Sequence, residues 1–461
     1  VGLSSDLEQS RSRGYAFTVE GFTQENPKSL IMGLYYPEGS KPTGYEAFSR
    51  RVGTVANFNY SFDDRYFSDI SYRIDGSSQF GKNKRFAPFF SMGLGWNLHN
   101  EKFLRTVPFI DRLTLRTSYG QNGSQQFQSF QAIATYDYYV NDRYHEWMGI
   151  FQKALDNPNL EWQKTNKYNI GIDADLLKNR LAFRLDVYRE NTNNMLSSRW
   201  LPLSSGFTSY MENIGEVQNN GFELRVIGNI IRNTSKNIFL NVSASIANNE
   251  SKMVRLSEAL KQAYSKEEAQ TKKDPSRIIR EGDALNTIYV VKSLGIDPSN
   301  GRELFLKRNG DVTYNWSSED LVACGSNRPK YRGVATTSLR YKNLSLNMAF
   351  SYYWGGQIYN STLLNKIENA DKHYNVDERV YYDRWKSPGD HTFFKGINNL
   401  TPTYATSRFV QNDNVFTCKN IQLSYEIRGN KMLKRYTGLE SLIFKADASD
   451  IFYWSTVRQE R

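Results

Sequence analysis

Apolar and polar side chains alternate residue by residue in segments spread over the whole chain. In "RLAFRLDVYRE", residues 180–190, the apolar side chains point one way and the charged ones, such as Arg184 and Asp186, point the other. A period of two is typical of a β-strand, because successive side chains of a strand face opposite sides. We therefore predict an all-β chain. The apolar positions of six such segments are Leu113, Leu115 and Tyr119; Tyr168, Ile170, Ile172, Ala174 and Leu176; Leu181, Phe183, Leu185 and Val187; Phe222, Leu224, Val226 and Ile230; Leu344, Leu346, Met348 and Phe350; and Ile421, Leu423, Tyr425 and Ile427.

The glycines of "FFSMGLGWNL", residues 89–98, raise the question of a phosphate-binding loop. Gly93 and Gly95 match the start of a dinucleotide fingerprint, but the third glycine is missing. The same stretch alternates like the others, with Gly93 and Gly95 on the polar face, where we expect small side chains to leave room. The predicted apolar face consists of Phe90, Met92, Leu94, Trp96 and Leu98.

The connections between the predicted strands fall into two length classes. Short polar turns are expected at residues 63–65, 177–180, 232–237 and 341–343. Long connections alternate with them and are expected at residues 120–161, 251–283 and 355–414. Short turns at one end and long loops at the other are typical of an outer-membrane barrel, whereas a soluble sandwich has no reason to separate them.

The two faces of the predicted strands also favour an antiparallel transmembrane β-barrel. The polar face carries mostly Ser, Asn, Asp, Arg, Gly and Thr, which suits a confined polar interior. Counting hairpins gives roughly 14 to 16 strands, more than side chains can fill, so the lumen needs water or a plug. Aromatic residues near strand ends are expected in the girdles at the two membrane surfaces. They are Trp96, Tyr119, Tyr188, Trp354 and Trp454.

Composition excludes several other classes. No run approaches the roughly 20 apolar residues of a transmembrane helix. The net charge of +11 comes from basic residues interspersed with acidic ones, which argues against nucleic-acid binding. Cys324 and Cys418 have no disulfide or metal-binding spacing. The first residues, "VGLSSDLEQSRSRGYAF", lack a signal peptide, so either the protein is not exported or the chain begins in its middle.

Several segments, in order along nearly the whole chain, resemble the barrel of SusC/RagA-type TonB-dependent outer-membrane transporters. The resemblance implies a barrel of about 22 strands with a plugged lumen. It further implies an importer of oligosaccharides or peptides in the outer membrane of Bacteroidota, driven through TonB, with a SusD-like surface lipoprotein as a lid and dimerisation of the importer pair. The segments are "DDRYFSDISYRIDGSSQFGKNKRFAPFFSMGLGWNLHNEKFL", "LTLRTSYGQNGSQQF", "LEWQKTNKYNIGIDADLLKNRLAFRLDVYRENTNNML", "ENIGEVQNNGFEL", "YKNLSLNMAF" and "DASDIFYWS".

The resemblance also predicts how the chain is organised. Residues 1–461 correspond to the C-terminal part of one barrel. The family's small N-terminal β-sandwich, TonB-interacting segment and plug would precede Val1, and a last strand would follow Arg461. We expect such a piece to have open edges, which a bilayer does not tolerate. The functional hypothesis therefore concerns the parent protein.

Motifs that could carry catalysis or bind a metal or cofactor have simpler interpretations. Residues 75–78, "DGSS", and 297–301, "DPSNG", are predicted turns, the second lacking the ligand spacing of a calcium loop. No nucleophile elbow or triad spacing appears, so no enzyme and no cofactor are expected. The histidines lack metal-ligand spacing, and no metal site is expected; they are His99, His145, His373 and His391.

Three loop segments mix aromatic rings with Asp, Asn and Arg: residues 136–147, 351–360 and 377–385. Such surfaces can hold a sugar or a peptide, because rings cover C–H faces and polar groups fix orientation. Packing within the loops, together with docking of the lid, is the simpler explanation and is favoured over ligand binding. No individual ligand-binding residue is predicted, and the sequence does not reveal the substrate.

Two alternatives remain open at this stage. One is a TonB-dependent receptor for siderophores or cobalamin, although the "DGSSQFG" and "LEWQKTNKYNIG" segments favour the SusC/RagA type. The other is a secreted β-rich adhesin or carbohydrate-binding module. The latter predicts a protein that is soluble without detergent and folds from these residues alone.

Overall fold

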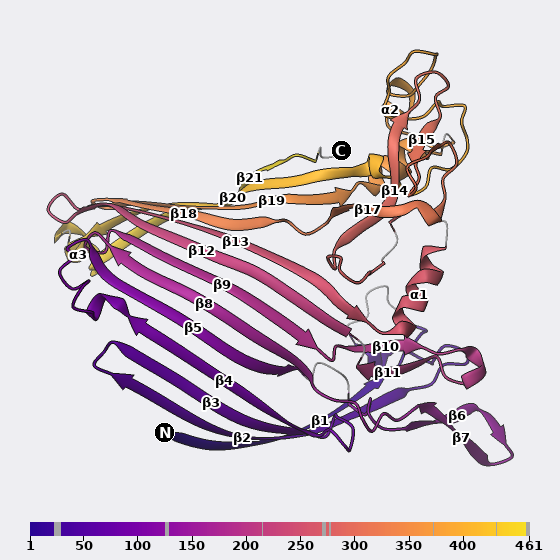
Figure 1. Ribbon diagram of the computed structural model, residues 1–461, viewed down its shortest axis with the longest axis horizontal. Coiled ribbons are helices and arrows are strands. Elements are labelled where there is room, and N and C mark those ends of the chain that lie inside the picture. Colours follow the sequence, from indigo (N-terminus) through magenta and orange to yellow (C-terminus); the bar gives the residue numbers. More distant parts are fainter. Residues whose placement is uncertain are drawn as a thin grey trace.

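The computed structural model describes residues 1–22, 29–124, 129–213, 215–269, 273–275, 278–371, 373–429 and 431–457. Within these residues, 13 antiparallel strands form one sheet in the order β1-β2-β3-β4-β5-β8-β9-β12-β13-β18-β19-β20-β21. Figure 1 shows this sheet curving from β1 along the bottom to β21 at the top. No helix among the described residues is long and apolar enough to cross a membrane.

The strands of the main sheet are mostly long. Their bounds are β1 Gly2–Ala16, β2 Thr43–Phe62, β3 Tyr66–Ser77, β4 Phe86–Asn97, β5 Ile110–Ser124, β8 Gln163–Leu176, β9 Leu181–Asn193, β12 Gly215–Asn233, β13 Ile238–Leu256, β18 Tyr331–Tyr341, β19 Leu344–Tyr359, β20 Val410–Arg428 and β21 Ser441–Ser455.

The remaining elements lie in the connections. Their strands form two hairpins, β6–β7 and β10–β11, and one sheet of order β16-β15-β14-β17. Their bounds are η1 Leu30–Met32, η2 Leu98–Asn100, β6 Thr135–Tyr144, β7 Trp147–Ala154, β10 Leu196–Trp200, η3 Leu203–Ser205, β11 Ser209–Asn213, α1 Glu258–Glu268, β14 Thr287–Ile296, β15 Glu303–Leu306, β16 Val312–Thr313, η4 Ser318–Asp320, β17 Leu321–Ser326, the π-helix η5 Leu363–Glu368, α2 Arg379–Tyr382, η6 Ser407–Phe409 and α3 Lys431–Thr437.

The predicted apolar stripes line up across the sheet. Residues directly opposite each other in an antiparallel pair share a face. Leu115 lies opposite Ile172, Ile172 opposite Leu185, and Leu185 opposite Leu224. The other face carries charge, for Arg116 binds Asp173 with Nε 2.8 Å from Oδ2. The alternation is confirmed, and it gives the sheet one apolar and one polar face.

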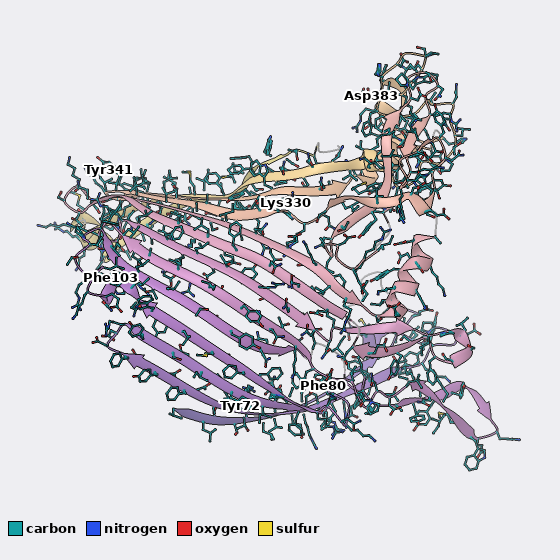
Figure 2. All side chains as sticks on the ribbon, viewed as in Figure 1. Tyr72, Phe80, Phe103, Lys330, Tyr341 and Asp383 are labelled. Atoms are coloured by element: carbon teal, nitrogen blue, oxygen red, sulfur yellow. The ribbon has the colours of Figure 1, made fainter. Side chains whose placement is uncertain are left out.

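Connection length separates by end as predicted for most of the sheet, with an overlap: residues 78–85 at the loop end form a shorter connection than residues 98–109 and 429–440 at the other end. The turns at residues 63–65 and 177–180 join β2 to β3 and β8 to β9, the turn between β18 and β19 begins at Lys342, and the fourth shortens to 234–237. Arg232 and Asn233 still pair with β13, which explains the difference. Figure 1 places α3 at this end and α1, α2 and the small sheets at the other, and Figure 2 shows Tyr341 at the first end and Asp383 at the second.

The long connections differ in extent from the prediction. The one after β13 runs to residue 330 rather than ending at 283, because residues 287–326 form the small sheet of β14 to β17. The connections at 17–42 and 194–214 were not predicted. The estimate of 14 to 16 strands is too high for the main sheet, which has 13, because some alternating segments pair within loops.

Residues 75–78 were predicted to form a turn, and for the first three this is wrong. Asp75, Gly76 and Ser77 belong to β3, and the turn begins at Ser78. The strand continues because Asp75 and Gly76 still pair with both β2 and β4. On one face, Arg73 Nε also binds Asp75 Oδ1 at 2.7 Å. Gly76 also gives the Phe86 ring room, since a Cβ there would lie 2.4 Å from that ring.

Two smaller predictions have different outcomes. Leu98 does not extend β4, because it starts the 3₁₀ turn η2. The turn at residues 297–301 is confirmed: Gly301 N donates to Asp297 O at 2.8 Å. Gly301 has a φ of +69°, in the left-handed region where glycine is unstrained.

The two glycines of β4 have different surroundings. A Cβ on Gly93 would meet only Asp69 Cβ, at 4.0 Å, so this position leaves open space as expected. A Cβ on Gly95 would lie 1.7 Å from the Phe67 ring. The expectation of room is therefore wrong at Gly95, whose missing side chain is replaced by a neighbour's ring.

Three tryptophans lie on the apolar face, as predicted. Trp96 and Trp454 are each one residue before a strand end, whereas Trp354 is five residues before the end of β19, so for Trp354 the prediction holds in part. Trp96 stacks on Tyr66 with ring centroids 6.1 Å apart, and its Nε1 donates to Glu101 Oε1 at 3.0 Å. The Trp354 and Trp454 rings meet at 6.1 Å near the loop end. Indole rings whose N–H groups find a partner suit the boundary between an apolar and a wet environment.

The prediction holds for Tyr119 in part and is wrong for Tyr188. Tyr119 lies on the apolar face opposite Tyr168, although five residues before the end of β5. Tyr188 lies opposite Asn169 on the polar face, and its hydroxyl accepts from Asn249 Nδ2 at 2.9 Å. Its neighbour Val187 occupies the apolar position, which turns the Tyr188 ring to the other side.

Spin labels test the orientation of β4 in the whole protein reconstituted in a bilayer. Leu94 is 42% exposed on the apolar face, whereas Gly93 opens onto the polar one. We expect a label at position 94 to be relaxed by oxygen dissolved in lipid, and a label at 93 to be relaxed by a water-soluble nickel chelate. The reverse pattern would contradict the assignment of the faces.

Candidate functional site

Two long connections at the loop end fold together into one body, which we call the loop platform. It consists of residues 287–326 and the described part of 360–409. Strand β14 pairs with β15 and β17, and Val291 N donates to Ala405 O at 3.2 Å from the second connection. Figure 1 shows β14, β15, β17 and α2 together beyond the ends of β19 and β20. Ser326 N, which donates to Gln357 Oε1 at 3.0 Å, ties the platform to β19.

The loop platform has an apolar core of its own. Leu364, Phe409, Tyr289, Val290 and Val291 have no exposed surface. Burying a side chain of this size stabilises a fold by about 1.5–3 kcal/mol. One cluster consists of Leu363, Leu364, Ile367, Val380, Phe394 and Phe409. The other consists of Tyr289, Val291, Phe305 and Leu321, together with Ile278 from the segment that precedes the platform.

A buried charge network joins the two connections. Arg408, with 4% of its side chain exposed, binds Glu303 Oε2 and Glu368 Oε1, each at 2.7 Å from Nη2. Burial alone would raise the pKa of Glu368, but the Arg408 charge holds it below its usual value. Burial likewise opposes the charge on Arg408, and the two carboxylates raise its pKa nevertheless. Glu303 comes from β15, so the network fixes the second connection against the small sheet.

Two further buried cations, Lys395 and Arg384, lie next to this network. Lys395 Nζ donates to Thr403 Oγ1 at 2.9 Å and to the Thr401 carbonyl. Arg384 Nη2 donates to the carbonyl of Glu368 at 2.8 Å. Burial lowers the pKa of both Lys395 and Arg384. The hydrogen bonds hold these side chains in one arrangement and give the platform a rigid polar interior.

A pocket of about 410 Å³ lies beside the network. The Trp316 and Tyr404 rings pack at 5.1 Å, and Trp316 Nε1 donates to Ala405 O at 3.0 Å. Asn315 and Asn399 add amide groups to the lining. Aromatic faces with fixed hydrogen-bonding groups suit a sugar ring or a peptide. Glu303, Lys395 and Thr403, from the charge network, are also among the polar residues of the lining, as are Arg302, Tyr314 and Thr401.

The three loop segments singled out from the sequence have separate positions. Residues 351–359 belong to β19 and are therefore mostly strand rather than loop. Residues 136–147 lie in the β6–β7 hairpin, where Tyr136 and Trp147 are 64% and 78% exposed, and the side chains of 140–144 lie outside the described residues. None of these segments lines the pocket beside Trp316.

Residues 377–385 pack within the loop platform. Asp377 binds Arg379 at the start of α2, and this hydrogen bonding lowers the pKa of Asp377 to about 2. Trp385 Nε1 donates to Pro298 O at 2.9 Å and joins the two connections. Tyr381 and Tyr382 are 63% and 67% exposed. Loop packing thus accounts for Trp385, while the two tyrosines face outward.

Possible metal ligands are dispersed. His99 Nδ1 lies 3.1 Å from Leu113 O near the short-turn end, and His373 Nδ1 lies 2.8 Å from Asp371 Oδ1 in the second connection. The described residues contain no cluster of three or more His, Cys, Asp or Glu side chains that could hold a metal. Cys324 and Cys418 are free thiols.

The architecture has counterparts among known proteins. The family model for the β-barrel of TonB-dependent receptor-like proteins matches residues 4–400. The chain belongs to this family. Its members are outer-membrane transporters rather than enzymes, and this barrel is an outer-membrane protein.

Curated relatives and solved structures agree with the family. TonB-dependent receptor P3 of Formosa agariphila is 27% identical over 420 residues, covering 87% of this chain and 41% of the relative. SusC of Bacteroides thetaiotaomicron is 25% identical over 421 residues, covering 87% and 40%. The RagAB peptide transporter shares the fold with a TM-score of 0.84 at 23% identity, covering 99% and 49%. The chain thus spans about two fifths of the length of these curated relatives.

Removing the central cation should loosen the loop platform. In Arg408→Met, Glu303 and Glu368 would remain buried without their partner, which costs about 3–5 kcal/mol. We expect faster hydrogen exchange at β14 and residues 405–409 of the whole receptor. Lys419→Met is the matched control, because its pair with Asp450 is 54% and 70% exposed and should contribute under about 1 kcal/mol. Equal protection in both variants would contradict the role of Arg408.

Acid should weaken the same contact. The pKa of Glu368 lies below its ordinary value of 4.5, so its contribution to stability is complete above that pH. The contribution is lost as the pH falls through the lower, folded-state pKa. We expect pepsin to cut residues 360–409 increasingly below pH 4.5. Glu368→Gln, compared at each pH, should be cut more at pH 5 and change less on acidification; parallel curves would contradict this.

Proposed function

We propose that the whole protein is a TonB-dependent importer of nutrients, with oligosaccharides or peptides as the transported solutes. The observation that carries this proposal is the aromatic and amide-lined pocket beside Trp316 on the loop platform. Its chemistry suits both solute classes. The relatives support the proposal, since one is named SusC and one solved structure is titled a peptide transporter. Within the protein, residues 1–461 would form the C-terminal part of one barrel of about 22 strands.

The polar face of the sheet would line the path of the solute. A hollow of about 390 Å³ opens on this wall around Gly93 and Gly120. Asp69, Ser91 and Lys167 are among the polar groups that line it. A plug domain elsewhere in the protein would fill the lumen, and TonB would supply energy by acting on the N-terminal region.

A SusD-like surface lipoprotein would cap the loop end. The exposed rings of Tyr381, Tyr382 and Trp147 offer contact area for such a lid, because tyrosine and tryptophan carry much of the binding energy of protein interfaces. Two importer pairs would associate into a dimer. This arrangement assigns the pocket to the solute and the outward rings to the lid.

A change in the pocket tests the function. In the whole receptor, Tyr404→Ala should raise the half-saturating solute concentration about two- to tenfold, because losing an aromatic face costs about 0.5–1.5 kcal/mol. Growth on a panel of glycans and peptides, compared with a deletion strain, identifies the solute to be used. Tyr374→Ala is the control, since this tyrosine is 75% exposed in the same connection and outside the pocket.

The outcomes separate the hypotheses. If the deletion strain grows normally on every glycan and peptide but fails on a ferric siderophore or cobalamin, the import of oligosaccharides or peptides is wrong. If growth depends on a glycan or peptide but both tyrosine variants behave like wild type, the importer stands and the pocket is not its binding site.

A further inference from the structure

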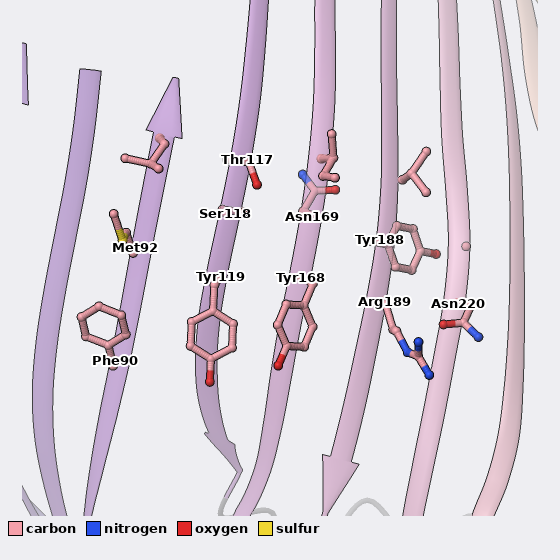
Figure 3. A pocket seen from close by; sticks show the side chains of 14 residues that line it. Phe90, Met92, Thr117, Ser118, Tyr119, Tyr168, Asn169, Tyr188, Arg189 and Asn220 are labelled. Atoms are coloured by element: carbon pink, nitrogen blue, oxygen red, sulfur yellow. The ribbon is translucent and has the colours of Figure 1, made fainter. Parts of the chain in front are cut away.

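Aromatic rings form a level row on the apolar face of the sheet, toward the loop end. Tyr119 on β5 lies opposite Met92 on β4 and Tyr168 on β8. The Tyr119 ring is 6.4 Å from Phe90 and 5.0 Å from Tyr168. Figure 3 shows the three rings side by side across β4, β5 and β8.

A row of amides follows two residues nearer the loops. Gln121 Nε2 donates to Asn166 Oδ1 at 3.0 Å, and Gln218 Nε2 donates to Asn191 Oδ1 at 3.0 Å. Asn166 and Asn191 lie directly opposite each other, so the four side chains share one level. Aromatic rings in one row and amides in the next mark the height at which the hydrocarbon of the outer leaflet ends.

A groove of about 560 Å³ runs below the ring row on this face. Leu94, Ile170 and Val187 are among its lining residues and are 42%, 58% and 50% exposed. Their apolar surface is extensive and lies on the lipid-facing side of the sheet. An alkyl chain is the ligand that such a surface accepts without leaving a polar group unpaired.

Arg189 stands in the ring row at the end of the groove. It lies opposite Tyr168 on one side and Asn220 on the other, and Figure 3 shows it between these two residues. Its side chain is exposed, and no described residue forms an ion pair with it. The next residue along this row is Glu250, opposite Asn220, and its carboxylate already binds Lys252 at 3.3 Å.

A cation at this height that has no partner within the described residues is open to an anion from outside the chain. A charged side chain near the hydrocarbon is unfavourable unless it is paired or hydrated, and guanidinium binds phosphate through two parallel hydrogen bonds. An anionic lipid of the outer leaflet supplies both a phosphate for Arg189 and an alkyl chain for the groove, since it carries its phosphate directly above its acyl chains. Charge and shape therefore point to the same occupant.

We propose that this groove is a binding site for an anionic, phosphate-bearing lipid of the outer leaflet. The headgroup phosphate binds Arg189, and one acyl chain lies along Leu94, Ile170 and Val187. The site depends on the barrel's place in the outer membrane but not on which solute is imported. Its position on β4 to β12, outside the lumen, separates it from the solute path.

Lipid retention by the whole receptor tests the site. The receptor is purified into nanodiscs of phosphatidylcholine doped with either phosphorylated lipid A or phosphatidylglycerol, and bound lipid is counted by native mass spectrometry. We expect enrichment of anionic lipid in wild type and a loss of at least about fivefold in Arg189→Gln. Lys252→Gln is the matched control, because that cation is already neutralised by Glu250 and should retain the lipid.

A second variant tests the acyl-chain part. Ile170→Trp should fill the groove and lower retention while leaving the charge in place. Unchanged retention in Arg189→Gln, or an equal loss in Lys252→Gln, would overturn the proposal. If Ile170→Trp retained the lipid fully, or if inorganic phosphate alone competed fully at millimolar concentration, the site would bind a free anion and the proposed lipid site would be wrong.

Discussion

Backbone hydrogen bonding is the constraint on which the rest of this structure depends. In hydrocarbon an unpaired N–H or C=O group costs several kcal/mol, so each strand needs a neighbour on both sides. The ladders satisfy that need for the main-sheet strands from β2 to β20, whereas β1 and β21 are each paired on one side among the described residues. The same ladders fix which side chains face lipid. A bulge between Cys418 and Asn420 shows how strictly this holds. It inserts Lys419, yet Ile421 and Cys418 remain opposite Met348 and Phe350 on one face.

The loop platform lies beyond the hydrocarbon and is stabilised differently. Its sheet is small, so the platform is held together both by buried apolar side chains and by buried charged side chains. Such charges are tolerated only when each is paired and hydrogen-bonded. Arg408 meets this condition through Glu303 and Glu368. Lys395 is hydrogen-bonded to Thr403, and the nearby Glu368 charge favours its charged form. Because these groups come from both connections, the pocket beside Trp316 has walls that are fixed relative to one another.

The sequence predicts which face of a strand each residue takes, because this depends on local alternation. It does not predict contacts between residues that are far apart in the chain. The apolar positions from Leu113 to Ile427 were predicted correctly, because alternation is a local pattern and the ladder preserves it. The prediction that Tyr188 lies in an aromatic girdle was wrong, because alternation puts Val187 on the apolar face and therefore Tyr188 on the polar one. The Glu303–Arg408 pair joins residues 105 apart, and no local pattern reports it. The pocket on the platform was missed for the same reason.

At Gly93 and Gly95, the residue opposite on the adjacent strand determines how much open space the glycine leaves on the polar face. Both lie on the polar face of β4, two residues apart. The ring of Phe67 covers Gly95, whereas Asp69, opposite Gly93, is short and leaves the wall hollow there. The depth of the lumen wall is therefore set by the side chains of the adjacent strand and not by glycine alone. A wall built in this way can change its shape by substitutions on one strand while the ladder that keeps it in the membrane stays intact.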